Sequence, residues 1–166
     1  MAGKMRRLIV IMGPSGSGKS TVAQALAEAV GARFVEADDH HPPANVALMR
    51  AGTALTDADR AAWLDALTAA IAGDDAQTVA TACSALTPYV QGRIQSECAR
   101  EVRFVLLDVG MEALADRLAA REGHFMNPEL LGSQLAALSA PEGVLRVDAD
   151  AAPDVVLHRV LAALDE

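Results

Sequence analysis

A glycine-rich segment between an apolar run and a helical pattern is the strongest constraint on how this chain can fold. The apolar run covers residues 8–12, and Gly13-Pro14-Ser15-Gly16-Ser17-Gly18-Lys19-Ser20 follows it directly. This segment fits the pattern G-x-x-x-x-G-K-[ST] in full, and the helical pattern begins at Lys19. Three glycines let the backbone curl so that successive N–H groups point inward. The sequence therefore predicts a strand, a phosphate-binding loop and a helix in succession.

The loop predicts a nucleotide site. The helix that follows it adds the positive end of its dipole. Lys19 can reach the β- and γ-phosphates, and the hydroxyl of Ser20 can bind Mg²⁺. Apart from Lys19 the chain has only Lys4, so no lysine remains for the Asn-Lys-x-Asp segment with which GTPases read guanine. ATP is therefore the expected nucleotide. The expected contacts in the loop and the first helical turn are Gly13, Ser15, Gly16, Ser17, Gly18, Lys19, Ser20 and Thr21.

Short apolar runs alternate along the chain with longer helix-prone segments. The predicted strands are 8–12, 33–35, 78–82, 102–107 and 144–147. The predicted helices are 19–30, 43–51, 57–72, 88–100, 111–121, 128–138 and 153–164. This alternation predicts an α/β fold in which helices cover both faces of a parallel five-stranded sheet. The length of 166 residues suits a single domain that spans residues 1–166.

The composition of the chain limits the classes of partner that it can bind. The net charge of −8 and an aromatic content of 3% argue against nucleic-acid binding, which needs a basic face or a stacking platform. No segment approaches the roughly 20 apolar residues of a membrane helix. The two cysteines, Cys83 and Cys98, are too few for a disulfide scaffold. We therefore expect a cytoplasmic protein that has no membrane or nucleic-acid partner. An acidic chain can still hold a small basic pocket, so anionic small molecules remain possible ligands.

A second cluster follows the second predicted strand and carries three acids, Glu36, Asp38 and Asp39. Ligands of open parallel sheets bind beyond the carboxyl ends of the strands, so this cluster should lie beside the phosphate-binding loop. A carboxylate there can accept the proton of an attacking hydroxyl and can help to hold Mg²⁺. Asp38 is the expected base and, with Ser20, the expected metal ligand. Glu36 and Asp39 are alternatives that spacing alone does not exclude.

Two arginines mark a third candidate region. Arg117 and Arg121 are four residues apart on a predicted helix, so both project from one face. A Gly-His-Phe segment follows them and could close over ATP, which predicts a small lid at about residues 118–140. Guanidinium groups aimed at the migrating phosphoryl group would stabilise its charge, with Arg121 as a catalytic residue. The alternative is an exposed helix face on which the arginines pair with Glu112 or Asp116.

Further short motifs follow one another along nearly the whole chain. They are Asp38…His41-Pro42…Asn45, Gly52…Leu55…Asp57…Asp59-Arg60…Trp63-Leu64, Cys83-Ser84-Ala85-Leu86, Arg117-Leu118…Arg121…Gly123-His124-Phe125 and Ser133-Gln134. With the phosphate-binding loop they resemble bacterial gluconate kinase (gluconokinase). The resemblance implies a three-layer P-loop NTPase fold of the shikimate- and adenylate-kinase type. It also implies ATP-dependent phosphorylation of D-gluconate to 6-phosphogluconate, and a homodimer.

The resemblance also implies roles for individual residues. Lys19 and Ser20 would serve the phosphates and Mg²⁺, and Asp38 would lie near the 6-hydroxyl of the sugar acid. His41 and Arg60 would line the sugar-acid pocket. Arg117 and Arg121 would lie at the lid, near the nucleotide. Trp63 is expected in the core rather than in contact with a ligand.

The chain departs from the family pattern at positions that usually carry positive charge, namely Leu48, Thr87 and Gln91. A gluconate carboxylate needs a cationic partner, and arginine is the usual strong one. Arg93 and His124 are the expected substitutes. If neither reaches the carboxylate, the acceptor would be another polyol, sugar acid or shikimate-like compound. The remaining alternative is an ATP-binding protein whose acceptor site has decayed.

Overall fold

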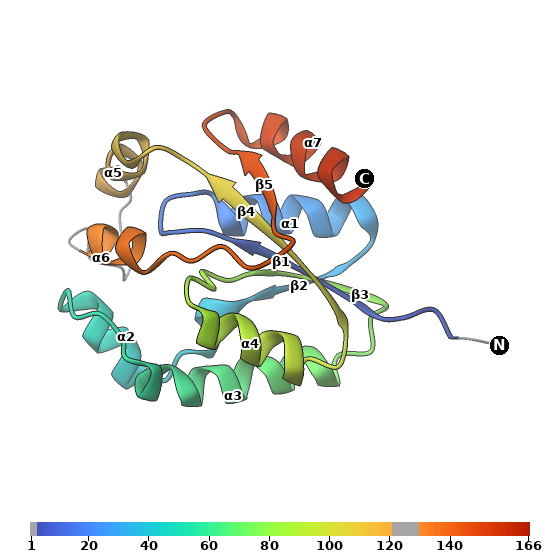
Figure 1. Cartoon of the computed structure of the whole chain (residues 1–166), viewed down its shortest axis with the longest axis horizontal. Helices are drawn as coiled ribbons and strands as arrows, with labels where there is room; N and C mark the ends of the chain where they lie inside the picture. The colour runs from blue at the N-terminus through green and yellow to red at the C-terminus, as the bar shows by residue number, and fades with distance from the viewer. Residues whose placement is uncertain (1–2, 121–129) are drawn as a thin grey trace.

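A single parallel sheet of five strands forms the centre of the structure, a computed structural model that describes residues 3–120 and 130–166 (Figure 1). The strands are β1 (Arg7–Met12), β2 (Arg33–Glu36), β3 (Thr78–Ala82), β4 (Glu101–Asp108) and β5 (Leu145–Asp148). Their order across the sheet is β2-β3-β1-β4-β5, and every neighbouring pair is parallel. The predicted α/β fold and its five-stranded sheet are confirmed.

Helices follow the strands much as the sequence predicts. They are α1 (Lys19–Val30), η1, a 3₁₀ helix (Ala37–His40), α2 (Pro43–Arg50), α3 (Asp57–Gly73), α4 (Pro88–Glu97), α5 (Met111–Ala119), α6 (Leu130–Ala137) and α7 (Pro153–Leu164). Helix α4 ends three residues before the predicted Arg100. Ala99 adopts a positive φ of 54°, which stops the helix, and the Arg100 guanidinium turns back onto backbone carbonyls such as that of Ile71.

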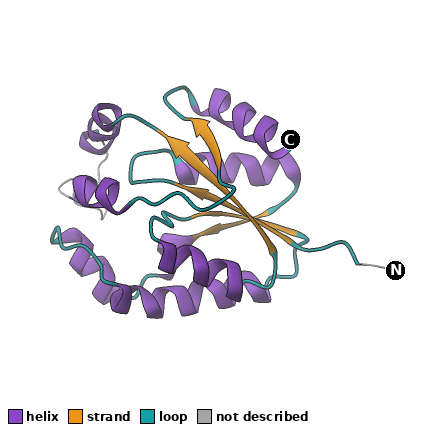
Figure 2. Ribbon diagram, in the orientation of Figure 1, coloured by secondary structure: helices purple, strands orange, loops and turns teal. Residues whose placement is uncertain are grey.

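Alternating side chains of β1 supply the two halves of the core. Leu8, Val10 and Met12 pack on one face with α3 and α4. Ile9 and Ile11 pack on the other face with α1 and α7. This period of two is what a strand buried on both faces requires, because successive side chains point to opposite sides of the sheet. Figure 2 shows the resulting three layers of helices, sheet and helices.

The remaining helices lie beyond the carboxyl ends of the strands. In Figure 1, α2, α5 and α6 lie at the end of the sheet that is opposite to the N-terminus of the chain. Leu114 and Leu118 of α5 pack against Leu131 of α6 in a small cluster separate from the main core. The chain thus places a second set of elements around the carboxyl end of β1, the strand at which the order of connections changes sides, with β2 and β3 on one side of it and β4 and β5 on the other. Such a switch point is where ligands of open α/β sheets bind.

Among residues 3–120 and 130–166, no helix combines the length and the apolar character needed to cross a bilayer.

Candidate functional site

The glycine-rich loop, residues 13–20, connects β1 to α1 as predicted, and positive φ angles shape it. Gly13, Gly16 and Gly18 have φ angles of 149°, 86° and 92°. Gly16 has a second constraint, because a Cβ atom there would lie 3.2 Å from the backbone oxygen of Leu114 in α5. The loop therefore depends on glycine both for its curvature and for the close approach of α5.

Three side chains contact the loop backbone. The Lys19 ammonium donates to the carbonyl of Pro14 at 3.1 Å. The Ser15 backbone N–H donates to the Gln134 side-chain oxygen, 2.8 Å away on α6. Arg117 on α5 donates to the carbonyl of Gly16 at 3.1 Å. Helices α5 and α6 are thus both attached to the loop, and Gln134 occupies an N–H group of the kind that binds phosphate oxygens.

The structure separates the three candidate acids. Glu36, at the end of β2, accepts a 2.5 Å hydrogen bond from the hydroxyl of Ser20. Burial raises the pKa of Glu36 above its ordinary value of 4.5, and the hydrogen bond from Ser20 opposes that rise. Asp38 lines a pocket with Lys19, whereas Asp39 is exposed and is not part of that lining. Glu36 therefore lies beside the candidate metal ligand Ser20, and Asp38 faces the cavity.

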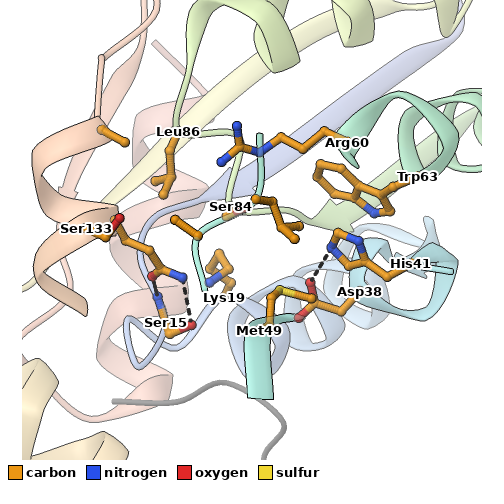
Figure 3. Close-up of a pocket in the computed structure, with 14 residues that line it drawn as sticks. Ser15, Lys19, Asp38, His41, Met49, Arg60, Trp63, Ser84, Leu86 and Ser133 are labelled. Atoms are coloured by element: carbon orange, nitrogen blue, oxygen red, sulfur yellow. Dashed lines mark hydrogen bonds and ion pairs between the residues drawn. The ribbon is translucent and has the colours of Figure 1, made fainter. Parts of the chain in front are cut away.

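The pocket that contains Asp38 brings together segments far apart in the sequence (Figure 3). It opens beside the phosphate-binding loop and is bounded by η1, α2, α3, the loop after β3, and α6. Its lining residues are Ser15, Lys19, Asp38, His41, Met49, Ala54, Leu55, Arg60, Trp63, Ser84, Leu86, Ser133, Gln134 and Ala137. The lining thus combines polar and charged side chains with apolar ones, as is usual for small-molecule sites.

His41 is held between an aromatic ring and an amide. Its ring stacks on Trp63 with centroids 4.4 Å apart and an interplanar angle of 13°. Its Nδ1 lies 3.3 Å from the Asn45 side-chain nitrogen, and its Nε2 lies 3.9 Å from an oxygen of Asp38. Burial lowers the pKa of His41, while the Asp38 charge opposes this and Arg60 adds to it.

Trp63 has two roles, one in the core, which the sequence predicts, and one in the pocket, which it does not. It is 2% exposed and belongs to the core, as expected. It also lines the pocket and packs on His41, and its indole N–H donates to the carbonyl of Ala37 at 2.8 Å. The spacing of Trp63 along α3 indicates burial but gives no sign of the ring that it meets on another element.

The two arginines expected near the acceptor have different surroundings. Arg60 lines the pocket, and its guanidinium also lies 3.2 Å from a carboxylate oxygen of Asp57. Arg93 does not line the pocket, contrary to its expected role as a substitute cation. Its guanidinium pairs with Asp65 at 2.6 Å and with Glu97 at 2.7 Å, between α3 and α4. Two carboxylates hold Arg93 there.

The positions that lack the family's positive charge also lie outside the pocket lining. The Thr87 hydroxyl accepts from the backbone N–H of Val90 and caps α4. The buried Gln91 side chain donates to the carbonyls of Ala85 and Ser139, and so ties the loop after β3 to the segment after α6. Leu48 is half-buried on α2. Thr87 and Gln91 therefore have structural roles in this chain.

A second pocket lies on the other side of the loop. Its lining residues are Gly16, Ser17, Gly18, Thr21, Val22, Arg117, Ala120, Ala149, Ala151, Pro153 and Val156. The Arg117 guanidinium spans this region, because it donates to the carbonyl of Gly16 and also to that of Ala149 at 3.1 Å. The alternative, in which Arg117 pairs with Glu112 or Asp116, is not the arrangement found. Arg121 and His124 lie outside the described residues.

Metal-binding side chains are sparse. Within the described part of the chain, no group of three or more histidine, cysteine, aspartate and glutamate residues could enclose a metal ion. Cys83 is buried, and burial raises its thiol pKa to about 12. A cation in this site would therefore have few direct protein ligands, which is the usual situation for Mg²⁺ bound with nucleotide phosphates.

Comparison with known proteins agrees with this geometry. A family model described as an AAA domain matches residues 8–141. A gluconokinase from Gluconobacter oxydans is 45% identical over 162 residues, which cover 93% of this chain and 89% of the relative. The crystal structure of a gluconokinase from Sinorhizobium meliloti has a TM-score of 0.85 and 37% identity, covering 98% of this chain and 94% of that one.

A more distant structure shows how widely the architecture is shared. Shikimate kinase from Aquifex aeolicus has a TM-score of 0.64 at 16% identity, covering 95% of this chain and 96% of that one, and it supports the fold alone. The phosphate-binding loop, the pocket beside it and the identity across almost the full length of named relatives lead to one assignment. The chain belongs to the gluconokinase family of P-loop kinases.

Proposed function

We propose that this chain transfers the γ-phosphoryl group of ATP to the 6-hydroxyl of D-gluconate. The observation that carries the proposal is that Lys19 of the phosphate-binding loop lines the same pocket as Asp38, His41 and Arg60. The groups suited to bind phosphate and those suited to bind the acceptor therefore line one cavity. Relatives named gluconokinase, similar over most of their length, support gluconate as the acceptor.

The residues divide the reaction between them. Loop N–H groups and Lys19 bind the β- and γ-phosphates and offset their charge. Asp38 accepts the proton of the attacking hydroxyl while the oxygen of that hydroxyl forms a bond to the γ-phosphorus. The bond from that phosphorus to the bridging oxygen breaks, and ADP leaves with the electron pair. Arg60 pairs with the carboxylate of the sugar acid at the other end of the pocket. Arg121, with Arg117, is proposed to steady the charge of the phosphoryl group.

The residues around Ser20 fit a magnesium ion. The Ser20 hydroxyl, the Glu36 carboxylate hydrogen-bonded to it, and the Asp38 carboxylate that lines the pocket are hard oxygen donors. Ser20 would hold the ion directly, and Asp38 and Glu36 would hold it directly or through water. When bound, Mg²⁺ neutralises phosphate charge.

The adenosine part of ATP needs a binding region of its own beside the loop. The second pocket, beside Thr21 and Arg117, is lined largely by small apolar side chains and continues from the loop. We assign it to the adenosine part of ATP. The attachment of α6 to the loop through Gln134 and Ser15 supports a lid over about residues 118–140 that excludes water when it closes. His124, in the same region, is proposed to help bind the acceptor.

The proposal also includes a homodimer in the cytoplasm that acts on small molecules, without nucleic-acid or membrane partners. The family resemblance supports the dimer, and the acidic, aromatic-poor composition supports the absence of a nucleic-acid partner.

The first prediction concerns turnover. ADP release should be observed with gluconate and Mg-ATP in a panel that also contains other aldonates, polyols and shikimate. Asp38→Asn should lower kcat by roughly 100-fold or more while ATP affinity changes little, because the amide cannot accept the proton. Lys19→Ala serves as the inactive control. Turnover only with another acceptor would contradict gluconate as substrate, and ATP binding without any turnover would contradict kinase function.

The second prediction separates two arginines. Arg60→Gln should raise the KM for gluconate by roughly 10- to 100-fold, since it removes a charge-assisted hydrogen bond to the carboxylate. The KM for ATP should stay within about twofold. Arg93→Gln is the matched control, because Arg93 lies outside the pocket and pairs with Asp65 and Glu97. Equal KM values for gluconate in the two variants would contradict the assignment of Arg60.

The third prediction uses the raised pKa of Glu36. An acid whose pKa is raised on folding costs stability when ionised, and the cost is absent when the pH falls below about 4.5. Glu36→Gln should therefore be more stable than the natural chain near neutral pH, and the difference should vanish near about pH 4. Urea unfolding at both pH values measures this difference in stability. The kcat of the variant should fall, because Glu36 lies beside the candidate metal ligand Ser20. A variant that is less stable at both pH values contradicts the prediction.

A further inference from the structure

The orientation of one buried amide can be deduced from its partners. Asn45 lies in the first turn of α2 and is 4% exposed. Its side-chain nitrogen is 2.8 Å from the backbone oxygen of Asp59, at the start of α3. A backbone carbonyl only accepts hydrogen bonds, so the NH₂ group of Asn45, and not its oxygen, must face it.

The same nitrogen faces His41. The second N–H of Asn45 points toward His41 Nδ1, 3.3 Å away. Nδ1 must therefore carry a lone pair, because two N–H groups cannot share one hydrogen bond. In a neutral imidazole the proton then resides on Nε2. Nε2 faces Asp38, at 3.9 Å from its carboxylate oxygen.

Trp63 fixes the plane of the imidazole ring. The two rings are stacked, and the indole N–H is tied to the carbonyl of Ala37 at 2.8 Å. The His41 side chain is only 5% exposed. The ring therefore has little room to turn over and exchange its two nitrogens. Figure 3 shows His41 against Trp63, with its hydrogen-bonding edge toward Asp38.

We propose that Asn45 is a positioning residue that holds His41 in its Nε2–H tautomer, so that His41 offers the acceptor a hydrogen-bond donor beside Asp38. The proposal deepens the proposed function and rests on it for the identity of the acceptor. The distance of 3.9 Å between Nε2 and Asp38 exceeds a direct hydrogen bond. An acceptor hydroxyl can therefore receive the N–H of His41 on its oxygen while its own proton points to Asp38.

This arrangement gives the hydroxyl one orientation. A hydroxyl has one donor and two acceptor positions, so it can bind in several ways to a site that both donates and accepts at each contact. With His41 locked as a donor and the Asp38 carboxylate as an acceptor, only the orientation in which the hydroxyl proton faces Asp38 remains. Fixing that geometry is a recognised source of rate enhancement.

The tautomer can be measured without any enzyme assay. The full-length chain is labelled with ¹⁵N-histidine, and two-bond ¹H–¹⁵N correlations at about pH 8 distinguish the two neutral forms. Loss of one set of signals in His41→Gln assigns His41. We expect the natural chain to show protonated Nε2. Asn45→Ala should give a mixture of tautomers, and Asn45→Asp, which can only accept, should move the proton to Nδ1.

A matched control separates positioning from loosening of the fold. Thr68→Val also removes a buried hydrogen bond from α3, that of the hydroxyl with the Leu64 carbonyl, but it does not touch His41. It should retain the Nε2–H signature. A natural chain with protonated Nδ1, or an unchanged tautomer in both Asn45 variants, would falsify the proposal. A change in Thr68→Val as large as that in Asn45→Ala would also overturn it.

Kinetics supply an independent readout. Asn45→Asp should lower kcat with gluconate by roughly 10- to 100-fold, with the KM for ATP unchanged. His41→Gln, whose amide nitrogen lies near the position of Nε2, should retain more activity than His41→Asn, and the reverse order counts against a donor at Nε2. If no sugar acid is phosphorylated by the natural chain, the proposed function fails, while the NMR result still decides the role of Asn45.

Discussion

The phosphate-binding loop curls at the carboxyl end of β1, the strand that has β2 and β3 on one side and β4 and β5 on the other. The positive φ angles of three glycines create this arrangement, and the N-terminus of α1 adds its dipole to it. An anion is stabilised at that point before any charged side chain is considered. The acceptor must approach the same point to react, which explains why η1, α2, α3 and α6 all contribute to one pocket beside the loop. Contacts from Arg117 and Gln134 attach the peripheral helices to the same backbone.

Local sequence predicts some parts of this site and not others. The loop could be predicted because its conformation depends on glycines and on a strand and a helix directly beside it. The roles of Glu36, Asp38 and Asp39 could not be ranked, because their division depends on which of them meets Ser20 from a different element. Arg93 shows the same limit, since helical spacing places it near the pocket but does not reveal that Asp65 on α3 holds it.

Gln91, at one of the positions where the family usually has a cation, has a structural role. Gln91 holds the Ala85 and Ser139 carbonyls together, and Ala85 has a φ of 47°, which is unusual for a residue other than glycine. The amide therefore supports a strained turn between two residues of the pocket lining, Ser84 and Leu86. Arg60 and Lys19 are the arginine and lysine of that lining, and Lys19 is proposed to bind the phosphates. The carboxylate of a sugar acid is left with Arg60 as its partner among the described lining residues.

The uncharged state of His41 follows from the balance of charges around it. Burial against Trp63 lowers the pKa of His41, and the charge of Arg60 acts in the same direction against the pull of Asp38. A protonated imidazole would attract the Asp38 carboxylate and weaken it as a proton acceptor. A neutral ring that donates from Nε2 leaves the Asp38 carboxylate available to take up a proton. The positive charge of the pocket therefore lies on Lys19 and Arg60, which are proposed to bind phosphate and carboxylate, and not on the ring beside Asp38, the proposed proton acceptor.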